Sequence, residues 1–238
     1  MQHLYSSINF FPFTTDQKKG GCVIKRVLIL GGEGHGSVIA SCINSNLSHD
    51  PNYEWEVAGF INDFVESVDG YPVLGGTSDI ERFVSEDYYF SWGIHLIAKN
   101  HKTIEAYDRL EIPKDRLATI IHYTAFIAES AVIESGCFVM YNAYIGPRTY
   151  ISEGTMIKAN TCIGHDVVIK RLCHVAMGAI VGSYSEMGEC SDVAIGARVL
   201  EKHKIGSCAM AGAGCVLTTD IPDNQIYVGV PAKYLRSL

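Results

Sequence analysis

A histidine with an acidic neighbour, His165-Asp166, is the pair in this chain best suited to moving a proton. A neutral imidazole with its ordinary pKa of ~6.5 can accept a proton from an attacking amine or hydroxyl near neutral pH. A carboxylate beside the ring can hold its orientation and stabilise its charged form. The pair therefore predicts general-base chemistry, with His165 as the base and Asp166 as its support.

A second feature with chemical meaning is the glycine-rich turn Gly31–Gly36, which follows the apolar run Val27–Leu30. A turn of this kind delivers backbone N–H groups to the beginning of a helix, which is a natural anion site. Counted from Gly32, the dinucleotide pattern G-x-G-x-x-G ends on Ser37 instead of a glycine, so the fingerprint is incomplete. The turn predicts an anion site but leaves the ligand open.

The elements around this turn alternate between strands and helices. Apolar runs predict strands over 27–30, 56–60 and 88–92, and helical spacing predicts helices over 38–47 and 102–110. This alternation favours a small parallel sheet, and we expect an α/β Rossmann-like domain over residues 25–117. Residues 1–24 form a poorly patterned leader, which we expect to be partly disordered or packed on a neighbour.

The second half of the chain repeats with a period of six. An apolar anchor recurs at every sixth residue from Ile121 to Leu217, and fourteen of these seventeen anchors are Ile or Val. The period fits a short strand followed by a corner, and three such units make one triangular coil of 18 residues. We expect residues 118–238 to form a prism of nearly six stacked coils with a C-terminal tail, ~25 Å tall at the ~4.8 Å spacing of neighbouring strands.

The composition excludes several classes of protein. The 238 residues carry a net charge of −7, which argues against nucleic acid as a partner because phosphate backbones require clustered Lys and Arg. No apolar run approaches the ~18 residues of a membrane span, and no secretory signal is visible, so we expect no membrane insertion. The eight cysteines form no C-x-x-C pair, so we expect reduced thiols and no metal.

The periodic segment resembles the hexapeptide-repeat acyltransferases, whose fold is a left-handed parallel β-helix. Together with the Rossmann-like unit, it is similar to the family of sialic acid O-acetyltransferases and UDP-4-amino-sugar (bacillosamine-type) N-acetyltransferases. The resemblance rests on Gly34-His35-Gly36, Asn62-Asp63, Gly164-His165-Asp166, His174 and the closing segment 228–233. It implies a cytoplasmic homotrimer whose acyl-CoA sites lie between neighbouring prisms, so that each site needs two subunits.

The resemblance also implies roles for individual residues. His165 corresponds to the general base, and Asp166 stands where the family often has Glu. His174 corresponds to a residue that contacts acetyl-CoA near the thioester. Further CoA contacts, largely through the backbone, map onto Ser183, Ile195 and Ala213. The nucleotide of a UDP-sugar maps onto Glu33, Gly34, His35, Asn62, Asp63 and Gly93.

The basic residues of the prism, apart from those in the motifs, have a simpler interpretation. They could meet the phosphates of CoA, but we interpret each of them as a solvent-exposed charge. These residues are Lys158, Lys170, Arg171 and Lys202.

The sequence thus predicts an acetyl-CoA-dependent acetyltransferase that acts by direct attack on the amine of a UDP-linked 4-amino-4,6-dideoxy sugar. An alternative with the same fold is O-acetylation of a sialic acid or another sugar. Two alternatives belong to other classes: a metal-dependent hydratase with zinc on His165, His174 and His203, and a non-catalytic nucleotide-sugar-binding scaffold. The hydratase is disfavoured because a catalytic zinc needs three convergent ligands, and these histidines do not obviously converge.

Overall fold

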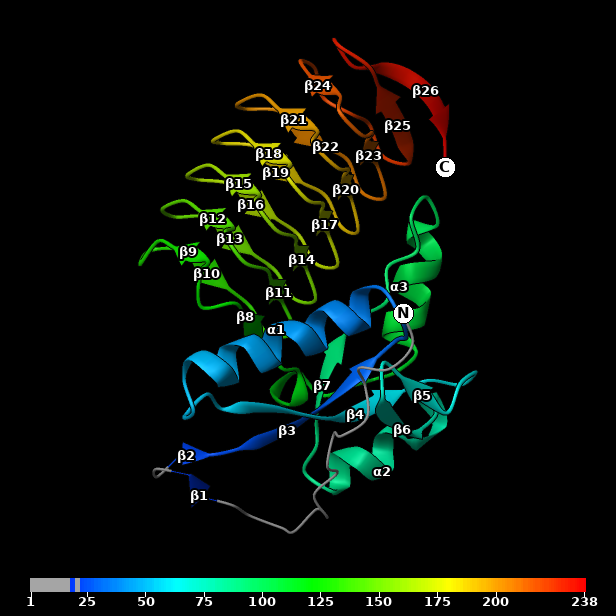
Figure 1. Ribbon diagram of the computed structural model, residues 1–238. Coiled ribbons are helices and arrows are strands. Elements are labelled where there is room, and N and C mark those ends of the chain that lie inside the picture. Colours follow the sequence, from blue (N-terminus) through cyan, green and yellow to red (C-terminus); the bar gives the residue numbers. More distant parts are fainter. Residues whose placement is uncertain (1–17, 20–21) are drawn as a thin grey trace, which may run out of the picture.

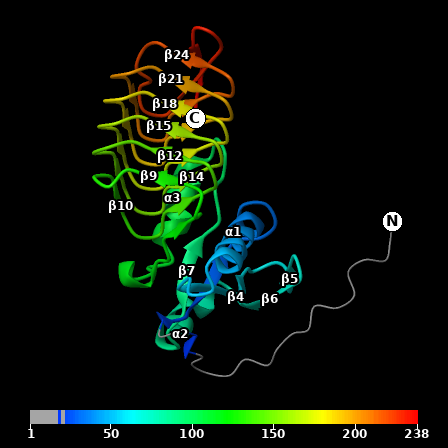
Figure 2. The ribbon, with the colours of Figure 1, turned by 60° about the vertical axis from the view of Figure 1, so that its left-hand side comes forward.

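The computed structural model describes residues 18–19 and 22–238 (Figures 1 and 2). The prediction for the leader falls largely on residues outside this part of the chain. Within the leader, β1 (Lys18–Lys19) and β2 (Cys22–Val23) pair as short antiparallel strands.

The N-terminal domain is built on a five-stranded sheet in the order β5-β6-β4-β3-β7. Its strands are β3 (Lys25–Leu30), β4 (Trp55–Ile61), β5 (Ser67–Val68), β6 (Tyr71–Gly75) and β7 (Tyr89–Trp92). The pairs β3–β4, β3–β7 and β4–β6 are parallel, and β5 pairs antiparallel with β6 at the edge. The expected parallel sheet is confirmed, and β5 and β6 are additions to it.

Three α-helices and two short 3₁₀ turns accompany this sheet. They are α1 (His35–His49), η1 (Thr77–Asp79), α2 (Ile80–Ser85), α3 (Asn100–Asp108) and η2 (Lys114–Arg116). Helix α1 lies between the sheet and the prism (Figure 1). Helix α3 runs along the side of the prism, from His101 beside Asn224 near the upper end to Tyr107 beside Glu153 in a lower coil. The two long helices therefore form the seam between the domains.

The prism consists of seventeen two-residue strands, β8 to β24, and each strand ends on one of the predicted anchors. Parallel pairing joins residues one coil apart, as in Phe138↔Met156 and Met156↔His174, which confirms the coil of 18 residues. The strands are β8 (Ile120–Ile121), β9 (Phe126–Ile127), β10 (Val132–Ile133), β11 (Phe138–Val139), β12 (Tyr144–Ile145), β13 (Tyr150–Ile151), β14 (Met156–Ile157), β15 (Cys162–Ile163), β16 (Val168–Ile169), β17 (His174–Val175), β18 (Ile180–Val181), β19 (Glu186–Met187), β20 (Asp192–Val193), β21 (Arg198–Val199), β22 (Lys204–Ile205), β23 (Met210–Ala211) and β24 (Val216–Leu217).

The strands stack into three sheets, and the prism is a left-handed parallel β-helix, as expected. We call the sheet that contains β8, β11, β14, β17, β20 and β23 the domain face, because it lies against the N-terminal domain. The other two are the β9 sheet (β9, β12, β15, β18, β21, β24) and the β10 sheet (β10, β13, β16, β19, β22). Anchors in the middle coils, such as Val139 and Ile163, are fully buried inside the prism.

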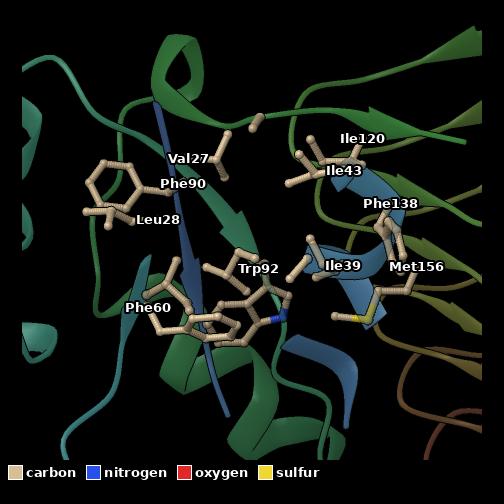
Figure 3. Packing of buried hydrophobic residues seen from close by; sticks show 14 of the residues in the cluster. Val27, Leu28, Ile39, Ile43, Phe60, Phe90, Trp92, Ile120, Phe138 and Met156 are labelled. Carbon is tan, nitrogen blue, oxygen red and sulfur yellow. The ribbon is translucent and has the colours of Figure 1, made fainter. Parts of the chain in front are cut away.

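The outward side chains of the domain face explain how the two domains adhere. Phe138 and Met156 pack in one cluster with Ile39 and Ile43 of α1 (Figure 3). Burial of each such side chain contributes about 1.5–3 kcal/mol. Asn46 of α1 adds two hydrogen bonds across the seam, donating to the Ile121 carbonyl at 2.8 Å and accepting from the Tyr123 amide at 3.0 Å.

A C-terminal hairpin covers the last coil. Strand β25 (Gln225–Val228) pairs parallel with β23, and β26 (Lys233–Ser237) pairs antiparallel with β25. Among the described residues, the helices are all too short or too polar to cross a membrane.

Candidate active site

His165 lies at the corner between the β9 sheet and the β10 sheet, between β15 and β16. Its Nδ1 is 2.6 Å from Oδ2 of Asp166, so the predicted pair is in contact. The side chain is 42% exposed, which leaves Nε2 as the ring nitrogen available to a substrate. Gly164 lets the corner pack closely, because a Cβ there would lie 2.6 Å from the Ser183 hydroxyl.

Arg148, one coil below, also binds this acid. Its Nε and Nη2 donate to the two Asp166 oxygens at 2.7 and 2.6 Å, a bidentate pair. Hydrogen bonds from Arg148, and secondly from His165, hold the pKa of the Asp166 carboxyl far below its usual range. Asp166 is therefore a permanent anion shared by two partners. The sequence analysis missed Arg148, although 166 − 148 = 18 is the length of one coil.

Three loops at strand ends of the N-terminal sheet meet, because β3 lies between β4 and β7. The Asn62 amide donates to the Gly31 carbonyl at 2.9 Å, and the Gly93 amide donates to the Leu30 carbonyl at 2.8 Å. A Cβ on Gly93 would lie 2.8 Å from that carbonyl oxygen, so the position requires glycine. The strand order reverses here, because the chain continues from β3 to β4 on one side and later reaches β7 on the other, as at the ligand sites of open parallel sheets.

The individual residues predicted for nucleotide binding have different environments. Asp63 accepts from the amide and the hydroxyl of Thr77 at 2.7 and 3.0 Å, so its carboxylate shapes the loop before α2. Glu33 and Gly34 are exposed, and His35 is partly buried. The predicted residues are thus brought to one edge of the sheet, where Asn62, Asp63 and Gly93 have structural partners.

The N-terminus of α1 has the properties of an anion site. Gly34 at its beginning adopts φ 92°, a conformation that favours glycine, and no side chain caps the helix. The first turn holds no acidic residue. The N–H groups of the first helical turn and the helix dipole therefore favour a negative group here.

His174 lies on β17 of the domain face and is buried beneath the N-terminal domain. Its ring stacks on His95 with centroids 4.4 Å apart, and His35 approaches edge-on at 5.5 Å. Asp192, one coil above, places Oδ1 2.7 Å from His95 Nε2 and 3.6 Å from His174 Nδ1. The sequence analysis identified His174 and His35 but not His95 or Asp192.

The electrostatics of this cluster follow from its burial. Burial opposes ionisation of Asp192, but contacts with His174 and His95 outweigh it and hold its pKa at about 2. Burial, and secondly the nearby Lys158 charge, lower the pKa of His35 to about 3. Burial likewise lowers the pKa of His174. The imidazoles of His35 and His174 are therefore kept neutral around a single carboxylate.

The interpretation of Lys158 as a solvent-exposed charge was wrong. Its side chain is buried between α1 and the prism, with Nζ 5.0 Å from the centre of the Phe138 ring. Burial lowers its pKa to about 8. Lys170 and Lys202 are exposed as expected, and Arg171 pairs with Asp108 and Glu189.

The residues predicted to contact CoA lie at two different corners. Ser183 is buried directly above Gly164 at the His165 corner. Ile195 and Ala213 are exposed at the corner between the domain face and the β9 sheet. One subunit therefore presents these residues on two edges, which flank the β9 sheet.

The third histidine of the hydratase alternative belongs to neither group. His203 Nδ1 lies 3.1 Å from Asp220 Oδ1. His165, His174 and His203 each have a different acidic partner, so one subunit does not gather them around an ion.

Comparison with known proteins matches residues 26–110 to the family described as PglD N-terminal domain. No curated protein matches the chain. Among solved structures, it is similar to PerB from Caulobacter crescentus in complex with CoA and GDP-perosamine, at 25% identity and TM-score 0.78 over 90% of this chain and 98% of that chain. It is also similar to the acetyltransferase domain of PglB from Neisseria gonorrhoeae in complex with acetyl coenzyme A, at 27% identity and TM-score 0.76 over 89% of this chain and 100% of that chain.

The prism, the matched domain and these neighbours define a hexapeptide-repeat acyltransferase. More narrowly, residues 26–110 match the PglD N-terminal domain, and the chain is similar over 89–90% of its length to the PglB acetyltransferase domain and to PerB, which confirms the resemblance seen in the sequence.

Proposed function

We propose that this protein transfers the acetyl group of acetyl-CoA to the amine of a UDP-linked 4-amino-4,6-dideoxy sugar, with His165 as the general base. The observation that carries the proposal is the contact between His165 Nδ1 and Asp166, which directs the other ring nitrogen to an open corner of the prism. The neighbours named above were solved with acetyl coenzyme A and with CoA and GDP-perosamine, which supports the classes of donor and acceptor.

The reaction is a direct transfer. His165 Nε2 accepts a proton from the amine as the nitrogen attacks the thioester carbonyl, so that a C–N bond forms and an oxyanion develops. When the intermediate collapses, the C–S bond breaks, and the CoA thiolate leaves and takes the proton from His165. Asp166 holds the ring through Nδ1 and stabilises the transient imidazolium. In the same proposal, His174 contacts acetyl-CoA near the thioester, with further CoA contacts from Ser183, Ile195 and Ala213.

The N-terminal domain holds the acceptor by its nucleotide. The uncapped N-terminus of α1 suits the diphosphate, and Glu33, Gly34 and His35 form its accessible rim. Asn62, Asp63 and Gly93 shape this rim through their contacts with neighbouring loops.

The complete site needs a second subunit. His165 and Ser183 lie at the corner between the β9 and β10 sheets. Ile195 lies at the corner between the domain face and the β9 sheet, and His174 lies near that corner, in contact with His35 at the start of α1. The β9 sheet between these corners exposes Phe126, which stacks on Tyr144 with ring centroids 5.4 Å apart. We infer a cytoplasmic homotrimer in which the β9 sheets face one another, so that the His165 corner of one subunit meets the domain face of the next.

A thiol-release assay tests the proposal. Purified protein and acetyl-CoA are mixed with UDP- and GDP-linked 4-amino-4,6-dideoxy sugars and with the matching 4-hydroxy sugars. We expect CoA release with the UDP-linked amino sugar and a fall of about 10²–10⁴-fold in kcat/KM for His165→Ala. His203→Ala is the control, because its ring pairs with Asp220 about two coils above His165 along the same corner. Release with hydroxy sugars alone would instead establish O-acetylation, and full activity of His165→Ala would remove His165 as the base.

A further inference from the structure

The buried cluster at the domain seam gathers three metal-ligating side chains. His95 comes from the loop after β7, His174 from β17 and Asp192 from β20. One ligand atom from each lies within 4.8 Å of the others. We propose that His95, His174 and Asp192 together bind one divalent transition-metal ion of the Zn²⁺ class. This proposal departs from the sequence expectation of no metal.

The geometry is close to that of a tetrahedral site. Metal–ligand distances of ~2.0–2.1 Å place tetrahedral ligands about 3.3 Å apart. The 3.6 Å between His174 Nδ1 and Asp192 Oδ1 fits this spacing, and the 2.7 Å between His95 Nε2 and Asp192 Oδ1 would open by about 0.6 Å. Two imidazoles and a carboxylate are a ligand set that suits zinc and its neighbours.

Burial and missing partners point to an ion rather than to a closed network of hydrogen bonds. The side chains of His95 and Asp192 are 2% exposed, and that of His174 is 9% exposed. Within the described part of the chain, His95 Nε2, His174 Nε2 and Asp192 Oδ1 have no well-aligned hydrogen-bond partner. A buried carboxylate without full compensation is unfavourable, and a cation would supply that compensation.

Asn100 at the start of α3 supports the site from behind. Its side-chain amide donates to Asp192 Oδ2 at 2.8 Å and to the Cys190 carbonyl at 2.5 Å. This fixes the carboxylate and leaves Oδ1 for a metal, which is the usual function of residues behind a ligand. The ring of His35, whose centroid lies 5.5 Å from that of His174, is a candidate for a fourth ligand.

The ion would join the two domains, because one ligand belongs to the N-terminal domain and two belong to the prism. A metal on Nδ1 of His174 would also fix the tautomer with hydrogen on Nε2, so that this N–H faces away from the ion. In the proposed function this N–H would face acetyl-CoA. That contact rests on the proposed function, whereas the metal site itself does not.

Metal content tests the site directly. The purified full chain is stripped with chelator, reloaded with Zn²⁺ or Co²⁺ and dialysed, and its bound metal and affinity are measured. We expect about one ion per chain and, with Co²⁺, the visible absorption of tetrahedral coordination. His95→Gln and Asp192→Asn should each weaken binding by at least about 100-fold, and Asn100→Ala by about 10–100-fold. His203→Gln and Asp220→Asn are matched controls from another His–Asp pair.

Two results would overturn the proposal. One is a wild-type protein that retains no more metal than Asp192→Asn, and the other is a loss in His203→Gln equal to that in His95→Gln. Thermal unfolding with and without Zn²⁺ shows whether each variant is folded, and the wild type and the controls should gain more stability from the ion than His95→Gln and Asp192→Asn do. None of these readouts uses acetyl transfer, so their failure would leave the assignment of His165 untouched.

Discussion

Asp166 supports His165 less freely than a lone carboxylate would, because Arg148 holds both of its oxygens. The guanidinium keeps the carboxylate ionised and fixed in place. The pair at the corner is therefore a triad of base, acid and cation.

Removal of Arg148 should lower the rate of the reaction. In Arg148→Met the Asp166 carboxylate loses its bidentate partner and is held less firmly against His165, so kcat should fall by about 10-fold. Asp166→Asn should reduce kcat further, because Nδ1 of His165 loses its carboxylate. Steady-state kinetics measure both effects, with Arg82→Met, whose guanidinium pairs with Glu86 on α2, as the control. An Arg148→Met variant with the wild-type kcat would contradict this account.

Lys158 costs the folded protein stability. Burial lowers its pKa from 10.5 to about 8, so the unfolded chain binds the proton more tightly between these pH values. The cost is therefore complete below pH 8 and fades as the pH rises toward 10.5.

Lys158→Met should raise the free energy of unfolding at pH 7 by about 1–3 kcal/mol, and by less at pH 9.5. Urea unfolding at the two pH values measures the difference. The exposed Lys170→Met should change stability by less than about 0.5 kcal/mol. A less stable Lys158→Met would show that the ammonium group has a favourable partner in the fold.

The corners of the prism position the side chains of the active site. Glycine is required at some corners by close contact between coils and at others by the backbone conformation. At Gly146 a Cβ would lie 2.7 Å from the Gly164 backbone, directly below His165. At Gly196 a Cβ would meet nothing within 4 Å, but φ is +66°, which favours glycine. Close stacking is thus the constraint at one corner and backbone conformation the constraint at the other.

Alanine at these two positions should separate the effects. Gly146→Ala must displace backbone and should destabilise the fold by about 2–4 kcal/mol, together with a loss of activity because the His165 corner moves. Gly196→Ala should cost only about 1–2 kcal/mol, the penalty of the left-handed conformation. Urea unfolding compares them, and equal costs would show that contact between coils is not the controlling factor.

The sequence predicted elements best where one local rule repeats. The period of six located all seventeen prism strands because each anchor has the same inward environment. Strand β6 was missed because Pro72 interrupts its apolar run and all five of its residues are half-buried, which removes any alternation. The partners of the site residues one coil away were predictable in principle, since 192 − 174 = 18 and 166 − 148 = 18. His95 was not, because its place beside His174 depends on how two domains dock.

For the whole molecule, the central expectation is that the active site is shared between subunits. The residues at the two corners that flank the β9 sheet come together only if a neighbouring subunit supplies one set. If the site is shared, a subunit that lacks one corner's residues can still form an active site with a neighbour that supplies them.

Complementation between two inactive variants tests this expectation. His165→Ala and His174→Ala should each be inactive as pure proteins. Co-expressed with different tags and purified through both, mixed trimers should regain activity at one of their three sites, about one third of the wild-type level. Mixed trimers without any recovery would indicate that each subunit holds a complete site. Co-expression of His165→Ala with Asp166→Asn, which damage the same corner, is the control.

The hairpin of β25 and β26 limits the length of the prism. Each coil pairs through its backbone with the coil above, so the last coil presents an upper edge that would accept another coil of the same cross-section. At the C-terminal end, β25 and β26 occupy that edge on the domain face. At the other end, no described strand pairs below β9 or β10, and their anchors Ile127 and Ile133 are only half-buried. A chain without the hairpin would therefore expose the backbone edge of the last coil, and pairing of that edge with another chain is the expected hazard that this small cap prevents.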